Sequence, residues 1–115
     1  MLAFPSAIKI HLAVAPVDMR KQFNGLWFQA QNALKVDPRE GAVFAFANKK
    51  RDRVKLLYWD GTGVCILAKR LEKGRFTWPA GGDSARLSLT PGALTMLLAG
   101  VDLREGRRKA WHEVR

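Results

Sequence analysis

Residues 43–78 read VFAFANKKRDRVKLLYWDGTGVCILAKRLEKGRFTW, and this stretch decides the fold. It contains three runs rich in aromatic and aliphatic residues, separated by turn-forming residues: 43–47, 53–59 and 64–70. Such a pattern is typical of consecutive antiparallel strands. The second turn begins with Asp60 and Gly61, which both tolerate the positive φ of tight hairpins. We therefore predict a β-meander of three or four strands, the fourth being residues 75–79.

The meander also carries much of the positive charge of the chain. Only Asp52, Asp60 and Glu72 oppose its cationic residues, which are Lys49, Lys50, Arg51, Arg53, Lys55, Lys69, Arg70, Lys73 and Arg75. Such a concentration of charge favours an anionic partner. The alternative is a solvated sheet face that carries charge for solubility.

Strand periodicity assigns these cations to a face of the sheet. Side chains alternate faces along a strand, which sets Val54, Leu56 and Tyr58 on one face. The other face then carries Arg53, Lys55 and Trp59, together with Leu57. A three-residue loop at 60–62 would pair Tyr58 with Val64, Leu56 with Ile66 and Arg53 with Lys69. Because like charges directly opposite one another are destabilising, this register favours an anion covering the basic face.

Outside the meander, apolar periodicity predicts further elements. Ile8, Ile10, Leu12 and Val14 alternate with more polar residues, as in a half-buried strand. Asp18 then resembles a helix N-cap, and Asp37-Pro38 ends the helix. The predicted helix covers about 19–34, with an apolar stripe of Met19, Phe23, Leu26, Trp27, Ala30 and Leu34.

The C-terminal part of the chain predicts a short strand, a short helix and a tail. Residues 86–89 form the strand, and Thr90-Pro91 starts the helix, which Gly100 closes. Leu94, Leu97 and Leu98 form its buried side. We expect one α+β domain over residues 1–103, with the antiparallel meander, one long helix packed on it and the short C-terminal helix. Residues 104–115 are expected to be a mobile basic tail that adds nucleic-acid contacts through Arg107, Arg108 and Lys109.

Composition narrows the class of protein. The chain has 115 residues, enough for one core, and a net charge of +10. That charge is expected of a partner for nucleic acid, or less often for an anionic membrane or an acidic protein. We expect a soluble cytoplasmic protein, since the sequence shows no signal peptide and no apolar run of ~20 residues that could span a bilayer.

Metal, cofactor and catalytic sites are not expected. Cys65 is alone and inside a strand, so we expect a buried, inert thiol. His11 and His112 have no carboxylate or thiol cluster around them. No pair of acidic residues has the spacing of metal ligands, and cap or turn roles account for Asp18, Asp37, Asp60 and Glu72.

The chain resembles a known family. The matching stretches are VDMRK (17–21), FNGL (23–26), FAF (44–46), DRVKLLYWDGTG (52–63), KRLEKGRFTWP (69–79) and LTP (89–91). They are similar to the accessory protein encoded by the second open reading frame of insertion-sequence-sixty-six-type bacterial transposons, often called TnpB and distinct from the RNA-guided nuclease of that name. Departures occur at Gln22, where relatives usually have Gly, and at Ile66 and Ala68, where relatives commonly have aromatic residues. The resemblance implies an accessory role in transposition beside a separate transposase, and it carries over no functional residues.

Two functions follow as alternatives to an enzyme. The first is a nonenzymatic accessory factor that binds DNA with little sequence preference through the basic sheet face and the tail. The second is a protein–protein adaptor that docks on the transposase without touching DNA, with Trp59, Trp78 and Trp111 as anchors. An open edge of the meander also permits a homodimer by strand pairing.

Overall fold

A computed structural model describes residues 7–100 of the protein. It contains a five-stranded sheet, two α-helices and one short 3-10 helix, η1 (Pro38–Glu40). The strands are β1 (Ile10–Ala13), β2 (Val43–Ala47), β3 (Arg53–Trp59), β4 (Val64–Arg70) and β5 (Arg86–Leu89). The helices are α1 (Phe23–Asn32) and α2 (Pro91–Leu98). The predicted boundary between residues 103 and 104 and the tail lie outside the described residues.

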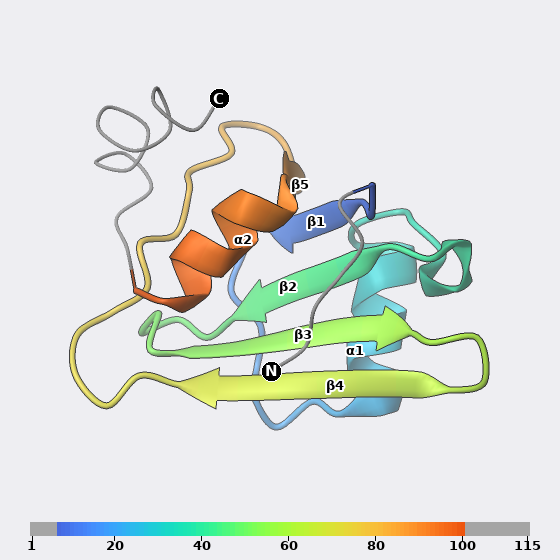
Figure 1. Ribbon diagram of the computed structural model, residues 1–115, viewed down its shortest axis with the longest axis horizontal. Coiled ribbons are helices and arrows are strands. Elements are labelled where there is room, and N and C mark those ends of the chain that lie inside the picture. The colour runs from blue at the N-terminus through green and yellow to red at the C-terminus, as the bar shows by residue number, and fades with distance from the viewer. Residues whose placement is uncertain (1–6, 101–115) are drawn as a thin grey trace.

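The sheet is mixed rather than purely antiparallel. Its order is β4-β3-β2-β1-β5 (Figure 1), so the predicted meander of β2, β3 and β4 is confirmed and forms one half of the sheet. β1 lies parallel to β2 because α1 provides the crossover between them, and β5 pairs antiparallel with β1. A parallel neighbour requires such a long connection, and this part of the topology was not predicted.

The β3–β4 register differs from the prediction by one residue. Trp59 pairs with Val64 and Arg53 with Arg70, whereas Lys69 pairs with Val54. The connecting turn therefore contains residues 60–63 rather than 60–62. The carboxylate Oδ1 of Asp60 accepts hydrogen bonds from Thr62 N at 2.8 Å and Gly63 N at 2.9 Å, which stabilises the longer turn.

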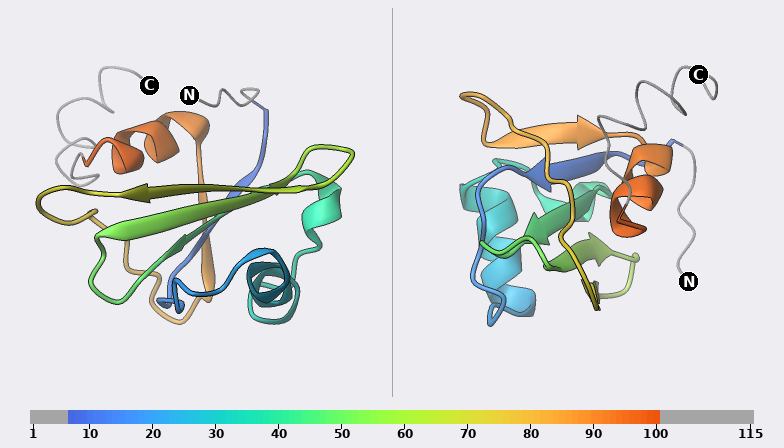
Figure 2. Two further views of the ribbon diagram at one scale, coloured as in Figure 1. Left: turned by 90° about the horizontal axis from the view of Figure 1, so that it is seen from below. Right: turned by 90° about the vertical axis from the view of Figure 1, so that its left-hand side faces the viewer.

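Each face of the sheet is covered by one helix (Figure 2). α2 packs on the face of Val54 and Leu56 by its buried residues Leu94, Leu97 and Leu98, as predicted for this helix. α1 packs on the opposite face through Leu26 and Ala30, which meet side chains of β2 and β3. The apolar residues buried on this second side are Ala13, Leu26, Ala30, Leu34, Ala42, Phe44, Phe46 and Leu57.

The first helix is shorter than predicted. It covers Phe23–Asn32 rather than about 19–34, and its N-cap Gln22 makes no side-chain hydrogen bond. Phe23 does not join the buried stripe, because 48% of its surface is exposed. Gly25 allows close packing, since a Cβ there would lie 3.1 Å from Cβ and Cγ of Lys21.

Residues 75–79 do not form a fourth meander strand. Phe76 N donates to the carbonyl of Arg51 at 2.7 Å, so this segment crosses the end of the sheet instead of pairing with β4. Phe76 is buried in the core on the side of the sheet that α2 covers, which we call the α2-side core, and Trp78 packs against this core. The predicted strand at 86–89 and the Thr90 cap are confirmed, with Thr90 Oγ1 accepting from Ala93 N at 3.1 Å.

A truncation in the α2-side core tests this packing. Leu97 is fully buried, so Leu97→Ala should lower the free energy of unfolding by about 2–5 kcal/mol. Urea denaturation followed by circular dichroism measures the change. Phe28→Ala is the control, because Phe28 is 62% exposed and its loss should change stability by less than about 0.5 kcal/mol. Equal losses in the two variants would contradict the assignment of the core.

Candidate nucleic-acid interface

The exposed cations of the meander gather at one end of the sheet, where β2 ends, β3 begins and β4 ends (Figure 1). We call this surface the basic end, and it consists of the exposed residues Lys49, Lys50, Arg53, Arg70, Lys73 and Arg75. The expected flat basic face does not form, because a helix covers each face of the sheet. The charges converge around its end instead.

Two backbone hydrogen bonds hold the basic end together. The loop after β4 folds back on the β2–β3 turn, with Leu71 N donating to the carbonyl of Asp52 at 2.9 Å. Phe76 N donates to the carbonyl of Arg51 at 2.7 Å. These contacts place Lys73 and Arg75, which are distant in sequence, beside the turn that carries Lys49 and Lys50.

Little acidic charge opposes the basic end. Asp52 accepts a hydrogen bond from Asn48 Nδ2 at 2.6 Å, and this bond holds the pKa of Asp52 below its usual value. Asn48 Oδ1 in turn accepts from the backbone N of Asp52 and of Arg53. Asp52 is therefore part of the turn itself. Glu72 is the other acidic residue on these two loops, and it is exposed.

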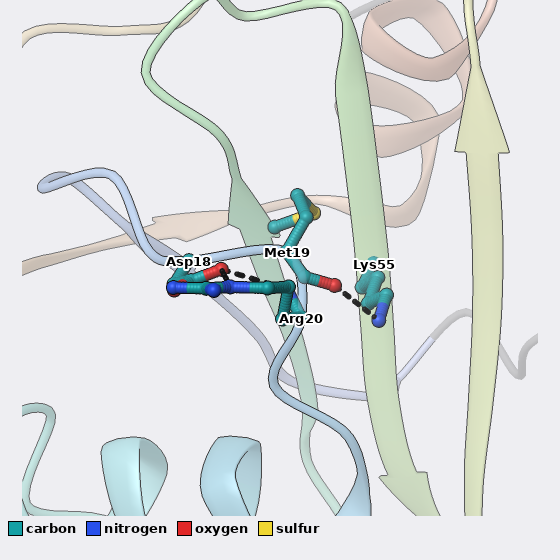
Figure 3. Close-up of polar contacts among 4 residues, drawn as sticks. All are labelled: Asp18, Met19, Arg20 and Lys55. Atoms are coloured by element: carbon teal, nitrogen blue, oxygen red, sulfur yellow. Dashed lines mark hydrogen bonds and ion pairs between the residues drawn. The ribbon is translucent and has the colours of Figure 1, made fainter.

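Lys55 is not part of this surface, contrary to prediction. Its side chain is 9% exposed, and Nζ donates to the carbonyl of Met19 at 2.8 Å (Figure 3). It also donates to the carbonyl of Lys21 at 2.8 Å. The prediction from strand alternation that Lys55 lies on the other face of the sheet from Val54 was correct. The expectation that this face is open to solvent was wrong, since α1 and the segment before it cover it. Lys55 thus joins β3 to the chain leading into α1.

The same contact explains why α1 starts late. In a continuous helix the carbonyls of Met19 and Lys21 would accept from residues 23 and 25. Both carbonyls instead bind the Lys55 ammonium, and the first helical bond runs from Leu26 N to the carbonyl of Gln22 at 2.9 Å. The predicted role of Asp18 as helix N-cap is therefore wrong.

Asp18 organises the turn before the helix. Its carboxylate accepts from Arg20 N at 2.9 Å and forms an ion pair with Arg20 Nη2 at 2.7 Å (Figure 3). The hydrogen bonds from Arg20 lower the pKa of Asp18 to about 2. Because the pair is exposed, its contribution to stability is small. It does orient the Arg20 guanidinium along the turn.

Arg51 and Lys69, two further predicted nucleic-acid ligands, have structural partners. Arg51 Nη2 donates to the carbonyl of Val14 at 3.1 Å, and its guanidinium lies 5.3 Å from the Trp78 ring centroid. Burial lowers the pKa of Arg51. Lys69 lies on the α2 face of the sheet, where Nζ donates to the Leu98 carbonyl at the end of α2, at 2.6 Å. Lys69 is therefore not on the same face as Arg53.

The predicted tryptophan anchors lie apart from one another. Trp59 is at the opposite end of β3 from the basic end and contacts Trp27 edge-on, with ring centroids 5.9 Å apart. The Arg39 guanidinium covers both rings, with its Cζ atom 5.6 Å from the Trp27 ring centroid and 5.7 Å from the Trp59 ring centroid. Trp78 donates from Nε1 to the carbonyl of Ala13 at 2.8 Å. Trp111, like the predicted ligands Arg107, Arg108 and Lys109, lies outside the described residues.

A second, weaker concentration of cations lies away from the basic end. A surface pocket of about 490 Å³ is lined by Lys9, His11, Lys35, Glu40 and Arg86, among others. Burial and the nearby Arg86 lower the pKa of His11. Arg86 Nη1 donates to the carbonyl of Leu34 at 2.7 Å, so this guanidinium is held by the chain just after α1. No local pattern in the sequence indicates this pocket, because its residues come from four separate segments.

Acidic residues elsewhere in residues 7–100 have local structural roles. Asp37 accepts from Arg39 N at 2.9 Å and caps η1. Within this part of the chain, no three His, Cys, Asp or Glu side chains are grouped so as to hold a metal ion. Cys65 is half-buried rather than fully buried, and Sγ lies 3.6 Å from Asp60 Oδ2. Burial, followed by the Asp60 charge, raises the pKa of the Cys65 thiol.

The Lys55 contact can be tested by an apolar replacement of similar length. Lys55→Met keeps the stem but leaves the carbonyls of Met19 and Lys21 without their charged donor. The free energy of unfolding should fall by about 1.5–3 kcal/mol, the usual worth of hydrogen bonds to charged groups. Urea denaturation measures it. Lys73→Met is the control, because Lys73 is exposed; a Lys55→Met effect as small as that of the control would contradict the structural role.

The turn at Asp60 should respond to acid. Hydrogen bonds from Thr62 and Gly63 lower the pKa of Asp60 from 3.8 to about 2. Because the pKa of Asp60 is lower in the folded than in the unfolded protein, its carboxylate stabilises the turn at pH values above the unfolded-state pKa. This stabilisation is lost as the pH falls through the folded-state pKa. The backbone amide signals of Thr62 and Gly63 should therefore titrate by NMR with a midpoint near pH 2. Asp60→Asn should abolish the transition, and a midpoint near 3.8 would contradict the bonded turn.

Comparisons with known proteins identify the family. A family model described as IS66 Orf2-like protein matches residues 8–108. The chain is 38% identical over 109 residues to the Sinorhizobium fredii protein y4jC, covering 95% of this chain and 92% of the relative. It is 35% identical over 104 residues to y4hO of the same organism, covering 90% of each. No solved structure matches the chain, and no helix within residues 7–100 is long and apolar enough to cross a membrane. The protein thus belongs to the IS66 Orf2-like family, the accessory proteins of IS66-type transposition.

Proposed function

We propose that this accessory protein binds duplex DNA through the basic end, with contacts made mainly to phosphates. The proposal assigns no catalytic step to the chain. Phosphate contacts position a protein on DNA but carry little sequence information, so we expect low sequence preference. The basic tail residues Arg107, Arg108 and Lys109 would add to the same electrostatic attraction.

The observation that carries the proposal is the convergence of exposed cations from two loops. Lys49 and Lys50 on one loop, and Lys73 and Arg75 on the other, are brought together by the backbone bonds at Leu71 and Phe76. Arg53 and Arg70 lie directly opposite one another on β3 and β4. Paired like charges destabilise a sheet, and a bound phosphate between them would relieve the repulsion.

A second candidate is an adaptor that docks on the transposase without contacting DNA. The observation that favours it is aromatic exposure away from the basic end. Phe28 on α1 is 62% exposed, and Trp27 and Trp59 are half-buried beneath Arg39. Aromatic residues and Arg are enriched at interface hot spots. The two candidates are separated by their response to salt.

Salt titration of binding to random-sequence duplex DNA tests the first candidate. If about six phosphates are neutralised, the log–log slope of affinity against salt should be about −5. The double variant Lys49→Ala/Lys50→Ala should weaken binding and flatten the slope by up to about two units, one for each phosphate that is no longer bound. Fluorescence anisotropy measures both quantities.

The control removes the same charge elsewhere. Lys9 and Lys35 line the pocket and are both exposed, so Lys9→Ala/Lys35→Ala lowers the net charge equally. If the basic end is the interface, this variant should keep a slope close to that of the unchanged protein. Equal effects of the two double variants would indicate diffuse attraction rather than a defined interface. No DNA binding at low salt would move the adaptor to first place.

A further inference from the structure

The outer edge of β4 presents backbone groups that have no partner among residues 7–100. Asp60 N donates to the carbonyl of Gly63 at 3.0 Å, and Leu71 N to that of Asp52 at 2.9 Å, so these bonds bracket the β3–β4 ladder. Hydrogen-bonded and non-bonded pairs alternate along an antiparallel ladder. Cys65, Leu67 and Lys69 therefore bond to β3. The residues whose N–H and C=O groups point away from β3 are Val64, Ile66, Ala68 and Arg70.

Most of this edge lacks the features that usually prevent strand pairing. Natural edges are protected by charged side chains, especially lysine, or by proline, bulges or short length. β4 has seven residues, and its pairing with β3 runs without a bulge from Val64 to Arg70. Val64, Cys65, Ile66 and Leu67 are half-buried and Ala68 is exposed, so the first five positions are apolar. Charge begins only at Lys69.

We propose that β4 pairs antiparallel with β4 of a second copy, so that the two sheets become one continuous sheet. With Leu67 opposite Leu67 of the second copy, the two strands overlap along their whole length. All four outward residues of each strand then find backbone partners. The facing side-chain pairs are Ile66 with Ala68, Cys65 with Lys69 and Val64 with Arg70.

Charge favours this antiparallel arrangement. No Lys or Arg of β4 faces another cation, since Lys69 and Arg70 lie opposite Cys65 and Val64 of the second copy. A parallel arrangement in register would set Lys69 against Lys69 and Arg70 against Arg70. The two basic ends lie at opposite ends of the joined sheet, and each lies beside the turn of the other copy that carries the Asp60 carboxylate. The pairing does not depend on DNA.

The mass of the full chain in solution, without DNA, tests the proposal. Light scattering coupled to gel filtration should give twice the chain mass of 12.9 kDa. Ala68→Pro removes one outward N–H at a position where edge strands tolerate proline, and it should shift the protein to monomer. Ser88→Pro is the matched control. Ser88 is exposed on β5, the other outer strand, and the Val14 N to Ala85 O bond sets its N–H outward.

Disulfide trapping gives a second measurement that does not depend on Ala68→Pro folding. In a Cys65→Ser background, Leu67→Cys should form a disulfide-linked dimer under mild oxidation. A non-bonded antiparallel pair has Cα atoms about 4.5 Å apart, within the range of disulfides. Ser88→Cys in the same background should remain unlinked.

Three results would overturn the proposal. In the first, the protein without substitutions remains monomeric at its highest soluble concentration. This would also be the outcome if the β4 edge pairs with a strand of another protein. Another is a dimer that a folded Ala68→Pro variant leaves intact, because it would use a different surface. The third is cross-linking of Leu67→Cys no faster than that of Ser88→Cys. None of these results bears on DNA binding by the basic end, which the monomeric Ala68→Pro variant tests separately.

Discussion

The ammonium group of Lys55, buried between β3 and the chain leading into α1, determines how the two halves of this fold meet. Its partners are the carbonyls of Met19 and Lys21 rather than a carboxylate. A buried charge is costly unless it is hydrogen-bonded, so the protein must keep this segment in place to satisfy it. The segment in turn carries Arg20 and Lys21 and sets the first residue of α1. One side chain therefore fixes the start of the helix and its position against the sheet.

The sequence was sufficient for most elements and insufficient for their long-range relations. The bounds of β2, β3 and β4 match the predicted ranges, because alternation and turn residues are local signals. The predicted β3–β4 register was wrong by one residue, because the length of the Asp60 turn depends on hydrogen bonds from Thr62 and Gly63 to the Asp60 side chain. The predicted start of α1 was wrong because the Lys55 ammonium, more than thirty residues away in sequence, binds two carbonyls of the segment before the helix. The parallel placement of β1 has no local signal at all.

The candidate interface shows the same contrast between local features, which the sequence predicts, and long-range arrangement, which it does not. Clustering in the sequence identified the cations, and Lys49, Lys50, Arg53, Arg70, Lys73 and Arg75 are exposed. Their arrangement was predicted as a sheet face because alternation was assumed to separate a buried side from a solvated one. That assumption fails when helices cover both sides, as α1 and α2 do here. Lys55, which is buried, and Lys69, which is exposed, then donate to backbone carbonyls of the segments that cover the sheet. The exposed cations of the basic end lie beyond the parts of the sheet that the helices cover.

The position of β1 between β2 and β5 has a consequence for how the chain folds during synthesis. The β2–β4 meander involves only neighbours in sequence and can form early, since local contacts close quickly. β1 is made first, yet its second neighbour β5 and the covering helix α2 are among the last described residues to be made. A ribosome-bound chain that stops before residue 86 therefore leaves one edge of β1 unpaired and the face of Val54 and Leu56 uncovered. Completion of the fold is a late, cooperative step, and prematurely terminated chains expose the apolar surface that quality-control proteases recognise.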